Sequence, residues 1–369
     1  MKHTIFLFMA LALAACSADD CYEIDDFVGN DTLSISFNGS EAVVGEVPYF
    51  VSVSTDGAHV VVNSYTSKYL VISLSGSTDD GSLLVYGKKK FGLELNGVSI
   101  SNPHGPAINN QCGKALHVTL CSGTTNSLTD GSDYATSFVN TAGDTIQQKG
   151  ALFSEGQIYF RGQGTLNVVG NAQNGIASDD YIYFEDGAIS ITVTANGKNG
   201  VKVNDGAFIQ GGELSIDVQA DGARGIKCDA RMEVSGGTTT ITTSGNPKIE
   251  TVDGVSDTTS CAGIKCDSLM TMTAGTLTIT STGDGGKGIN ATEGLLFQGG
   301  TLSVQATGTE DVAKPKGVKS DGFVTLSGGS FYSYSRKSKA VDNAGSDEPD
   351  IVGTPTIRQV GKREVRVVF

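Results

Sequence analysis

The sequence predicts an all-β protein, a single-stranded right-handed parallel β-helix with about 25 residues and three short strands in each rung. The first observation is a repeat over residues 152–333, whose aligned copies lie 24, 25, 25, 38, 25 and 29 residues apart. The second is an alternation of apolar and polar residues with period two, which indicates strands rather than helices. The third is a glycine pair, or its equivalent, before the last strand of a copy. The right hand follows from the strong preference of parallel crossovers for it.

The chain begins with a segment that resembles a lipoprotein signal peptide, which we assign to residues 1–15. A charged start, an apolar run too short to span a bilayer and the tetrad Leu13-Ala14-Ala15-Cys16 support this assignment. Cys16 would then be the lipidated first residue of the mature protein; an ordinary secretory peptide with a chance cysteine is the alternative. Ala18-Asp19-Asp20 resembles an acidic export tag, so we expect an outer membrane lipoprotein that faces the cell exterior.

The rest of the chain divides by how well it follows the repeat. Residues 16–30 are expected to form a lipidated linker, and residues 31–149 irregular rungs that cover the N-terminal end of the coil. Residues 150–338 hold the regular rungs, and residues 339–369 are expected to add capping strands. An insertion at residues 131–148 predicts an exposed loop, and a second insertion separates Asn246 from Ser260.

The copies align on one small residue that we expect to face the core. These residues are Ser154, Ser178, Val203, Cys228, Cys266, Ala291 and Ser320. Since Cys228 and Cys266 share this position on successive rungs, they should lie about 4.8 Å apart along the axis. We expect a ladder of buried thiols, because in-register geometry suits a disulfide poorly. The pairing stays open for the cysteines beyond Cys16, which are Cys21, Cys112, Cys121, Cys228, Cys261 and Cys266.

The formal net charge of −14 argues against nucleic acid and anionic membrane surfaces as partners. Next to the aligned residue, the positions expected to face solvent carry a column of lysines beside a column of carboxylates. The lysines are Lys202, Lys227, Lys265 and Lys319, and the carboxylates include Asp179, Asp229, Asp267 and Asp321. One interpretation is a solvated net of ion pairs. The other is that an acidic polysaccharide lays its carboxylates along the lysines while calcium fills the carboxylate column.

Two further rows are candidates for ligand contact. Tyr159, Tyr183 and Phe208 form an outward aromatic row, which could bind sugar rings or only stabilise the strands. Asp221 and Asp284 belong to a row of Asn and Asp at a corner of the coil. Such a row could bond to backbone groups or hold calcium.

Several motifs resemble those of the β-helical bacterial proteins labelled "carbohydrate-binding domain-containing", which are related in fold to pectate lyases. The most specific are KGALFS at residues 149–154 and, one rung later, NGIASD at residues 174–179. The resemblance implies a right-handed parallel β-helix that binds plant-type polysaccharides, including polygalacturonate and cellulose, together with calcium. Rungs of that family often place Asp just before the rung glycine, whereas this chain has Asn174, Asn199, Arg224, Ala262, Lys287 and Lys316 there.

The sequence therefore favours a binding protein over an enzyme: a surface lipoprotein that binds an acidic or plant-type polysaccharide, with calcium as the expected ion. A calcium-dependent polysaccharide lyase is the first alternative, because Lys227 or Lys265 beside Asp229 and Asp267 could act as a base near a uronate C5. An adhesin or structural surface protein without a glycan ligand is the second. No rung stands out as a catalytic centre.

Overall fold

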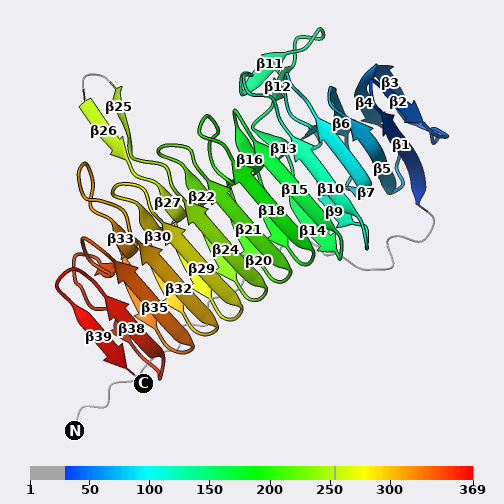
Figure 1. The fold of residues 1–369 in the computed structure, drawn as a ribbon. Helices are drawn as coiled ribbons and strands as arrows, with labels where there is room; N and C mark the ends of the chain where they lie inside the picture. The colour runs from blue at the N-terminus through cyan, green and yellow to red at the C-terminus, as the bar shows by residue number, and fades with distance from the viewer. Residues whose placement is uncertain (1–29, 253–254, 369) are drawn as a thin grey trace.

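The computed structural model describes residues 30–252 and 255–368, and in these ranges every regular element is a β-strand. The strands wind into one elongated coil, with the N-terminal rungs at one end and the C-terminal rungs at the other (Figure 1). No helix long and apolar enough to cross a membrane occurs in this part of the chain. The predicted signal peptide and Cys16 lie outside the described residues.

One rung consists of three strands joined by short corners. The rung that begins at residue 174 has strands β16 (Asn174–Ser178), β17 (Tyr181–Phe184) and β18 (Ala188–Val193). Each strand pairs in parallel with the corresponding strand of the next rung. β16 pairs with β19 (Val201–Val203), β17 with β20 (Gly206–Ile209) and β18 with β21 (Glu213–Val218). The predicted parallel β-helix, with about 25 residues and three strands per rung, is therefore confirmed.

The predicted register is confirmed residue by residue in the sheet built from the first strand of each rung. We call this the first-strand sheet; its regular strands are β13 (Gly150–Ser154), β16, β19, β22 (Arg224–Cys228), β27 (Ala262–Cys266), β30 (Lys287–Ala291) and β33 (Lys316–Ser320). The seven aligned small residues pair directly from Ser154 to Ser320. The same column continues to Asn110 in β8 (Ile108–Asn110) and Asn343 in β36 (Val341–Asn343).

The interior is filled by the predicted apolar rows. Ile226 and Ile264, two residues before the aligned positions, are fully buried, and so are Cys228 and Cys266. Both cysteines are free thiols that donate to backbone carbonyls, Cys228 to Arg231 at 3.1 Å and Cys266 to Ala230 at 3.0 Å. The expected ladder of buried thiols is present.

A glycine in each first strand departs from simple alternation. A Cβ on Gly225 would lie 2.3 Å from Cγ2 of Ile241 and 2.5 Å from the carbonyl oxygen of Gly263. Gly225 therefore faces the core, and so does the adjacent Ile226. Because two consecutive residues face inward, the residues on either side of them, Arg224 and Lys227, both face outward.

The two ends of the coil are closed by antiparallel strands. At the N-terminal end, β1 (Asp31–Asn38) pairs with β2 (Glu41–Val44), and β3 (Val51–Asp56) pairs with β4 (Ala58–Ser64). At the C-terminal end, β39 (Val365–Val368) covers β38 (Thr356–Val360) as an antiparallel cap. β38 itself pairs in parallel with β35 (Ser330–Ser335), so it extends the coil.

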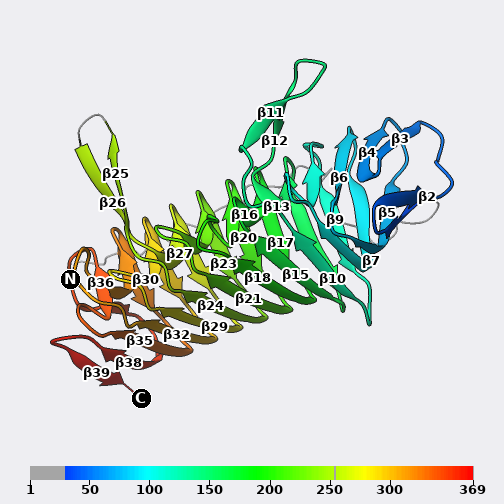
Figure 2. The same ribbon diagram turned by 45° about the horizontal axis from the view of Figure 1, so that its top comes forward.

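Both predicted insertions form hairpins that leave the coil at the corner before a first strand. The first consists of β11 (Ser137–Val139) and β12 (Thr145–Gln147), and the second of β25 (Lys248–Val252) and β26 (Val255–Thr259). They project on the same side of the coil in both views (Figures 1 and 2).

Candidate functional site

The predicted lysines lie in one column on the outer face of the first-strand sheet. Lys202, Lys227 and Lys265 are in direct register on β19, β22 and β27, and Lys319 follows on β33 with Asn290 between. We call these five residues the lysine stripe. The predicted aspartates Asp229, Asp267 and Asp321 follow two residues later along the chain, so cations and anions alternate across the sheet.

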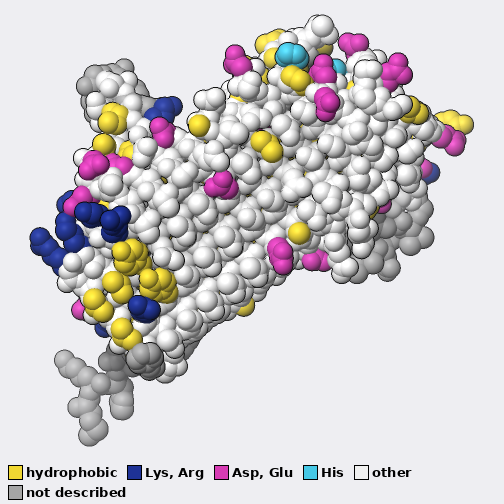
Figure 3. All heavy atoms as spheres, in the orientation of Figure 1, with side chains coloured by type: hydrophobic (Ala, Val, Ile, Leu, Met, Phe, Trp, Pro, Cys, Tyr) yellow, Lys and Arg dark blue, Asp and Glu magenta, His cyan; other side chains and the backbone are white. Residues whose placement is uncertain are grey.

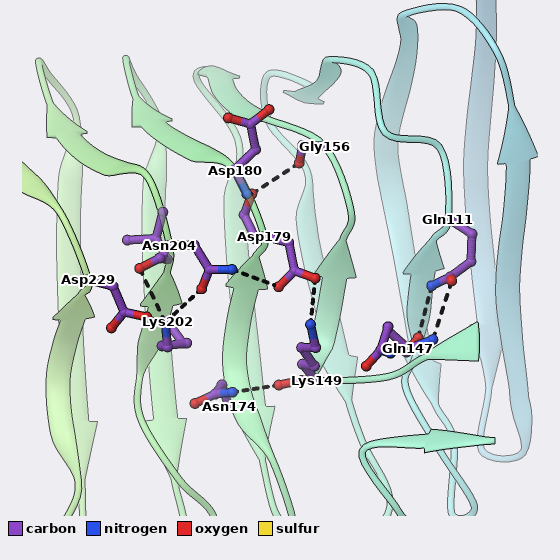
Figure 4. A network of polar contacts seen from close by, with 12 residues as sticks. Gln111, Gln147, Lys149, Gly156, Asn174, Asp179, Asp180, Lys202, Asn204 and Asp229 are labelled. Atoms are coloured by element: carbon purple, nitrogen blue, oxygen red, sulfur yellow. Dashed lines mark hydrogen bonds and ion pairs between the residues drawn. The ribbon is translucent and has the colours of Figure 1, made fainter. Parts of the chain in front are cut away.

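Carboxylates of the same face pair with every lysine of the stripe. Lys202 Nζ lies 2.5 Å from Asp229 Oδ2, and Lys227 Nζ lies 3.2 Å from Asp229 Oδ1. The distances are 2.7 Å for Lys265 with Asp267 and 2.6 Å for Lys319 with Asp321. Burial opposes ionisation of Asp229, but the hydrogen bond from Lys202 and the nearby positive charges lower its pKa below the ordinary value. The stripe is thus a net of ion pairs, part of which is drawn in Figure 4.

The remaining predicted metal ligands also have partners. Asp179 accepts from Lys149 at 2.5 Å and from Asn204 at 3.3 Å. At the corner, Asp221 accepts the backbone N–H of Asn246 at 2.8 Å. Asp284 accepts those of Asp311 and Val312 at 2.7 and 2.8 Å.

The fit of these carboxylates to calcium can be judged from their grouping. In residues 30–252 and 255–368, no three side chains of His, Cys, Asp or Glu gather as metal ligands would. Calcium takes six to eight oxygen ligands. Among the described residues, clustered carboxylate side chains therefore do not supply most of such a coordination shell.

The aromatic row forms a stacked ladder on the second strands. The rings of Tyr159 and Tyr183 have centroids 4.5 Å apart and an interplanar angle of 2°, and those of Tyr183 and Phe208 are 4.6 Å apart at 8°. His117 stacks on Tyr159 at 4.9 Å, and the guanidinium of Arg231 lies 5.1 Å from the centre of the Phe208 ring. Because each ring face covers the next, a sugar could reach only ring edges. This geometry favours the stabilising interpretation.

We expect Tyr183→Ala to lower the free energy of unfolding by about 2 kcal/mol, since the change removes two stacked contacts at once. Thermal unfolding followed by circular dichroism measures this, with Tyr49→Ala as the control because that side chain is 90% exposed. A variant with unchanged stability and weakened glycan binding would instead support a sugar platform.

A second column of cations lies on the same face. In the sequence its residues stand out as a departure from the aspartates of the resembled family, but the repeat pattern did not predict that they face outward beside the lysines. Arg224, Ala262, Lys287 and Lys316 are in register on β22, β27, β30 and β33, three residues before the lysine stripe. We call these four residues the basic column. They face outward because the two residues that follow each of them face the core. The sequence feature that could have revealed this orientation is the glycine followed by an aliphatic residue in each first strand, such as Gly225 and Ile226. Two consecutive inward-facing residues interrupt the alternation of inward and outward positions.

Arg224 and Lys287, the first two cations of the basic column, have no carboxylate partner in the part of the chain that the structure describes. Lys316 pairs with Asp342, which also lies 3.3 Å from Lys339. No ion pair joins Lys287 or Arg224 to a carboxylate elsewhere in the described part of the chain. Arg224 donates to the carbonyl of Gly222, while its Nε is buried without a hydrogen-bond partner.

The pKa of Lys287 reflects this lack of compensation. Burial, and to a smaller extent the neighbouring cations, lower the pKa of Lys287 to about 8. Burial also lowers the pKa of Arg224. A half-buried cation without a counterion is costly, so this part of the face is suited to an anion from outside the chain.

Positive charge also gathers beyond the basic column, at the C-terminal end of the coil, where Figure 3 shows a cluster of Lys and Arg side chains. A hollow of about 330 Å³ there is lined by Lys314, Lys337, Lys339, Lys362 and Arg363, together with Glu310, Asp347 and Glu364. In a chain with a formal net charge of −14, the basic column and this cluster concentrate cations toward one end.

Comparison with known proteins identifies relatives of this coil. The family model described as "Carbohydrate-binding domain-containing protein" matches residues 56–224 and 216–308. No curated protein matches. The solved structure of a polysaccharide lyase-like protein from C. thermocellum, a gadolinium derivative, is similar, with a TM-score of 0.54 and 22% sequence identity. The match covers 76% of this chain and 98% of that one, and at this identity it concerns the fold alone.

Proposed function

Because the chain belongs to the carbohydrate-binding domain-containing family, we propose that it binds an acidic polysaccharide along the outer face of the first-strand sheet. Polygalacturonate is the plant-type polymer that we propose as ligand, since it carries a carboxylate on every sugar. The observation that carries the proposal is a pair of cations, Arg224 and Lys287, that have no carboxylate partner among the described residues and lie two rungs apart in one column. Rungs are about 4.8 Å apart, so the two side chains start about 10 Å apart with only Ala262 between them.

The lysine stripe has a secondary part in this proposal. The four lysines of the stripe already pair with aspartates. A polymer carboxylate that replaced an aspartate would exchange one ion pair for a similar one, so the net gain in binding free energy would be small. Arg224 and Lys287 gain a counterion outright. We therefore expect most of the binding free energy to come from the basic column. Tyr159, Tyr183 and Phe208 would add only edge contacts.

Calcium belongs to the proposal only as an ion shared with the polymer. Asp229 and Asp267 lie on adjacent rungs and could supply part of a coordination shell, which carboxylates of the bound chain would complete. A chelator should then weaken polymer binding without changing the unfolding temperature of the free protein. Equal affinity with and without chelator would remove calcium from the proposal.

The location that we propose is the outer face of the outer membrane, with the lipid on Cys16 as anchor. The support is the sequence around Cys16, which lies outside the described residues. Membrane fractionation of cells that express the wild type and Cys16→Ser tests it, because the variant should leave the membrane fraction.

The binding proposal is tested by affinity electrophoresis or calorimetry with polygalacturonate. Arg224→Glu should weaken binding at least about tenfold, because it replaces an uncompensated cation with an anion in the same column. Lys114→Glu is the matched control, since this exposed lysine undergoes the same charge change on a distant corner. Wild-type binding should also weaken as salt is raised. Equal loss in both variants would mean that only net charge matters, and no binding by the wild type would overturn the proposal.

A polysaccharide lyase is the second candidate, and the specific observation that favours it is Lys287. A lysine with a pKa near 8 is partly neutral at neutral to mildly basic pH and can accept a proton. In a β-elimination it would take the proton from uronate C5 while the bond from C4 to the glycosidic oxygen breaks and a C4–C5 double bond forms. The leaving oxygen would take a proton from water, and the lysine would then return its proton to the solvent. Sustained ultraviolet absorbance from the unsaturated product would establish this activity. A glycan array that is blank for acidic and neutral polymers would favour the adhesin alternative.

A further inference from the structure

A second hollow lies far from the basic column, between the N-terminal rungs and the first projecting hairpin. It has a volume of about 420 Å³, and its side chains include Asn63, Tyr65, Tyr86, Lys88, Asn140 and Asp144. Asn63 lies in β4, Tyr86 in β6 (Gly81–Gly87), and the last two residues lie in the turn between β11 and β12. The hairpin leaves the coil beside these N-terminal rungs (Figure 2).

The backbone holds the walls of this N-terminal hollow in place. Asn63 and Tyr86 are in direct register on parallel strands. The backbone N–H of Tyr65 donates to the carbonyl of Phe50 at 2.8 Å, which fixes the residue just beyond β4. Opposite, Asn140 Oδ1 accepts the backbone N–H groups of Ala142 and Asp144, both at 2.9 Å, and so shapes the turn of the hairpin. The hollow is thus built from ordered segments on both sides.

The tyrosines of this hollow differ from those of the aromatic ladder in what covers them. In the ladder, each ring face is covered by the next ring. Tyr65 is 66% exposed, and no other described aromatic ring stacks on it. An exposed tyrosine ring has an apolar face that can take the C–H face of a sugar, and a hydroxyl that can bond to the sugar's rim.

The polar groups of the hollow select for an uncharged ligand. Lys88 and Asp144 carry opposite charges, so neither an anionic nor a cationic sugar is favoured. The side chains of Asn63 and Lys88 form no hydrogen bond or ion pair with another described residue. The polar groups of these two side chains are therefore available to the hydroxyls of a ligand. The basic column, in contrast, presents positive charge alone.

We propose that this N-terminal hollow is a binding site for a neutral oligosaccharide, with one sugar ring on Tyr65 and its hydroxyls on Asn63, Lys88 and Asp144. The chain would then hold two glycan sites of different charge preference, one near each end of the coil. The proposal rests on the carbohydrate-binding family but not on the acidic-polymer site, because no residue is shared between them.

Calorimetry of the full chain with hexasaccharides of β-1,4-linked glucose, xylose and mannose tests this proposal. At least one should bind the wild type, and Tyr65→Ala should weaken that binding at least about tenfold, whereas Tyr65→Phe, which keeps the ring, should bind within about threefold of the wild type. Tyr49→Ala is the matched control, because that tyrosine is 90% exposed but lines a different hollow. Polygalacturonate binding, measured on the same proteins, should not change.

The outcomes separate this site from the acidic one. If no neutral hexasaccharide binds, or if Tyr65→Ala and Tyr49→Ala bind equally well, the N-terminal site is overturned whatever polygalacturonate does. If neutral binding depends on Tyr65 while polygalacturonate fails to bind, the N-terminal site stands and the acidic site falls. A Tyr65→Phe variant as weak as Tyr65→Ala would contradict ring stacking.

Discussion

Replacing Gly263 with alanine is expected to destabilise the coil by at least about 2 kcal/mol, although the change adds a single methyl group. The added Cβ would lie 2.2 Å from Cγ2 of Ile279 and 2.9 Å from the carbonyl oxygen of Gly288. Ile279 is fully buried in the opposite sheet, and Gly288 occupies the same position one rung later. Neither neighbour can move without disturbing a sheet, so the methyl group forces the two sheets apart. Urea or thermal unfolding followed by circular dichroism measures the loss.

Gly113→Ala is the matched control for this prediction. No heavy atom lies within 4 Å of a Cβ built on Gly113, which is exposed on a corner. Its alanine variant should unfold within about 0.5 kcal/mol of the wild type. Because rungs contact mainly their neighbours, the coil need not unfold in a single two-state transition. The wild type and the variants should therefore be compared by both the midpoint and the slope of the unfolding curve. Equal stability of the two variants would mean that the sheets have room to spare at Gly263.

Gly225 occupies the position of Gly263 one rung earlier. The inward-facing glycine at this position explains which part of the fold could be predicted from the sequence and which could not. Repeat spacing and apolar alternation were enough for the register, because a shift of one residue would move every core side chain to the surface. Alternation fails at Gly225 and Ile226, which both face inward. Counting outward positions by parity from Cys228 therefore found Lys227 but missed Arg224.

The partners of the predicted site residues lay beyond what periodicity can show. A repeat places Lys202 and Asp229 on neighbouring rungs, but whether the lysine bonds to that carboxylate or extends to solvent depends on side-chain torsions. The same holds for Tyr159 and Tyr183, whose stacking at 4.5 Å leaves ring edges rather than faces to a ligand. The N-terminal hollow was missed because it joins the irregular rungs to the turn of an insertion.

Replacing Lys287 with methionine is expected to stabilise the fold and to weaken polygalacturonate binding, two effects that a merely structural lysine would not combine. At pH 7 this lysine is a half-buried cation beside other cations, and no carboxylate of residues 30–252 or 255–368 pairs with it. Methionine keeps most of the side-chain volume and removes the charge, so the free energy of unfolding should rise by about 1 kcal/mol. Binding of polygalacturonate should fall at least about tenfold, because an uncompensated contact to the polymer is lost.

The pH dependence gives a further readout of the same variant. The pKa of Lys287 is lowered from 10.5 to about 8, so between these values the unfolded chain binds more protons than the folded one. The wild type should therefore gain stability as pH rises through this window, and Lys287→Met should lose that gain. Polymer binding by the wild type should weaken above about pH 8, because only the protonated lysine attracts a carboxylate.

Lys114→Met serves as the control for both measurements, since it removes one charge from an exposed corner. Neither its stability nor its polymer affinity should change beyond the small effect of net charge. A Lys287→Met protein that is stabilised and still binds polygalacturonate as tightly as the wild type would show that the uncompensated cation has no part in ligand binding. A protein destabilised by the change would show instead that Lys287 has a partner that contributes to the fold.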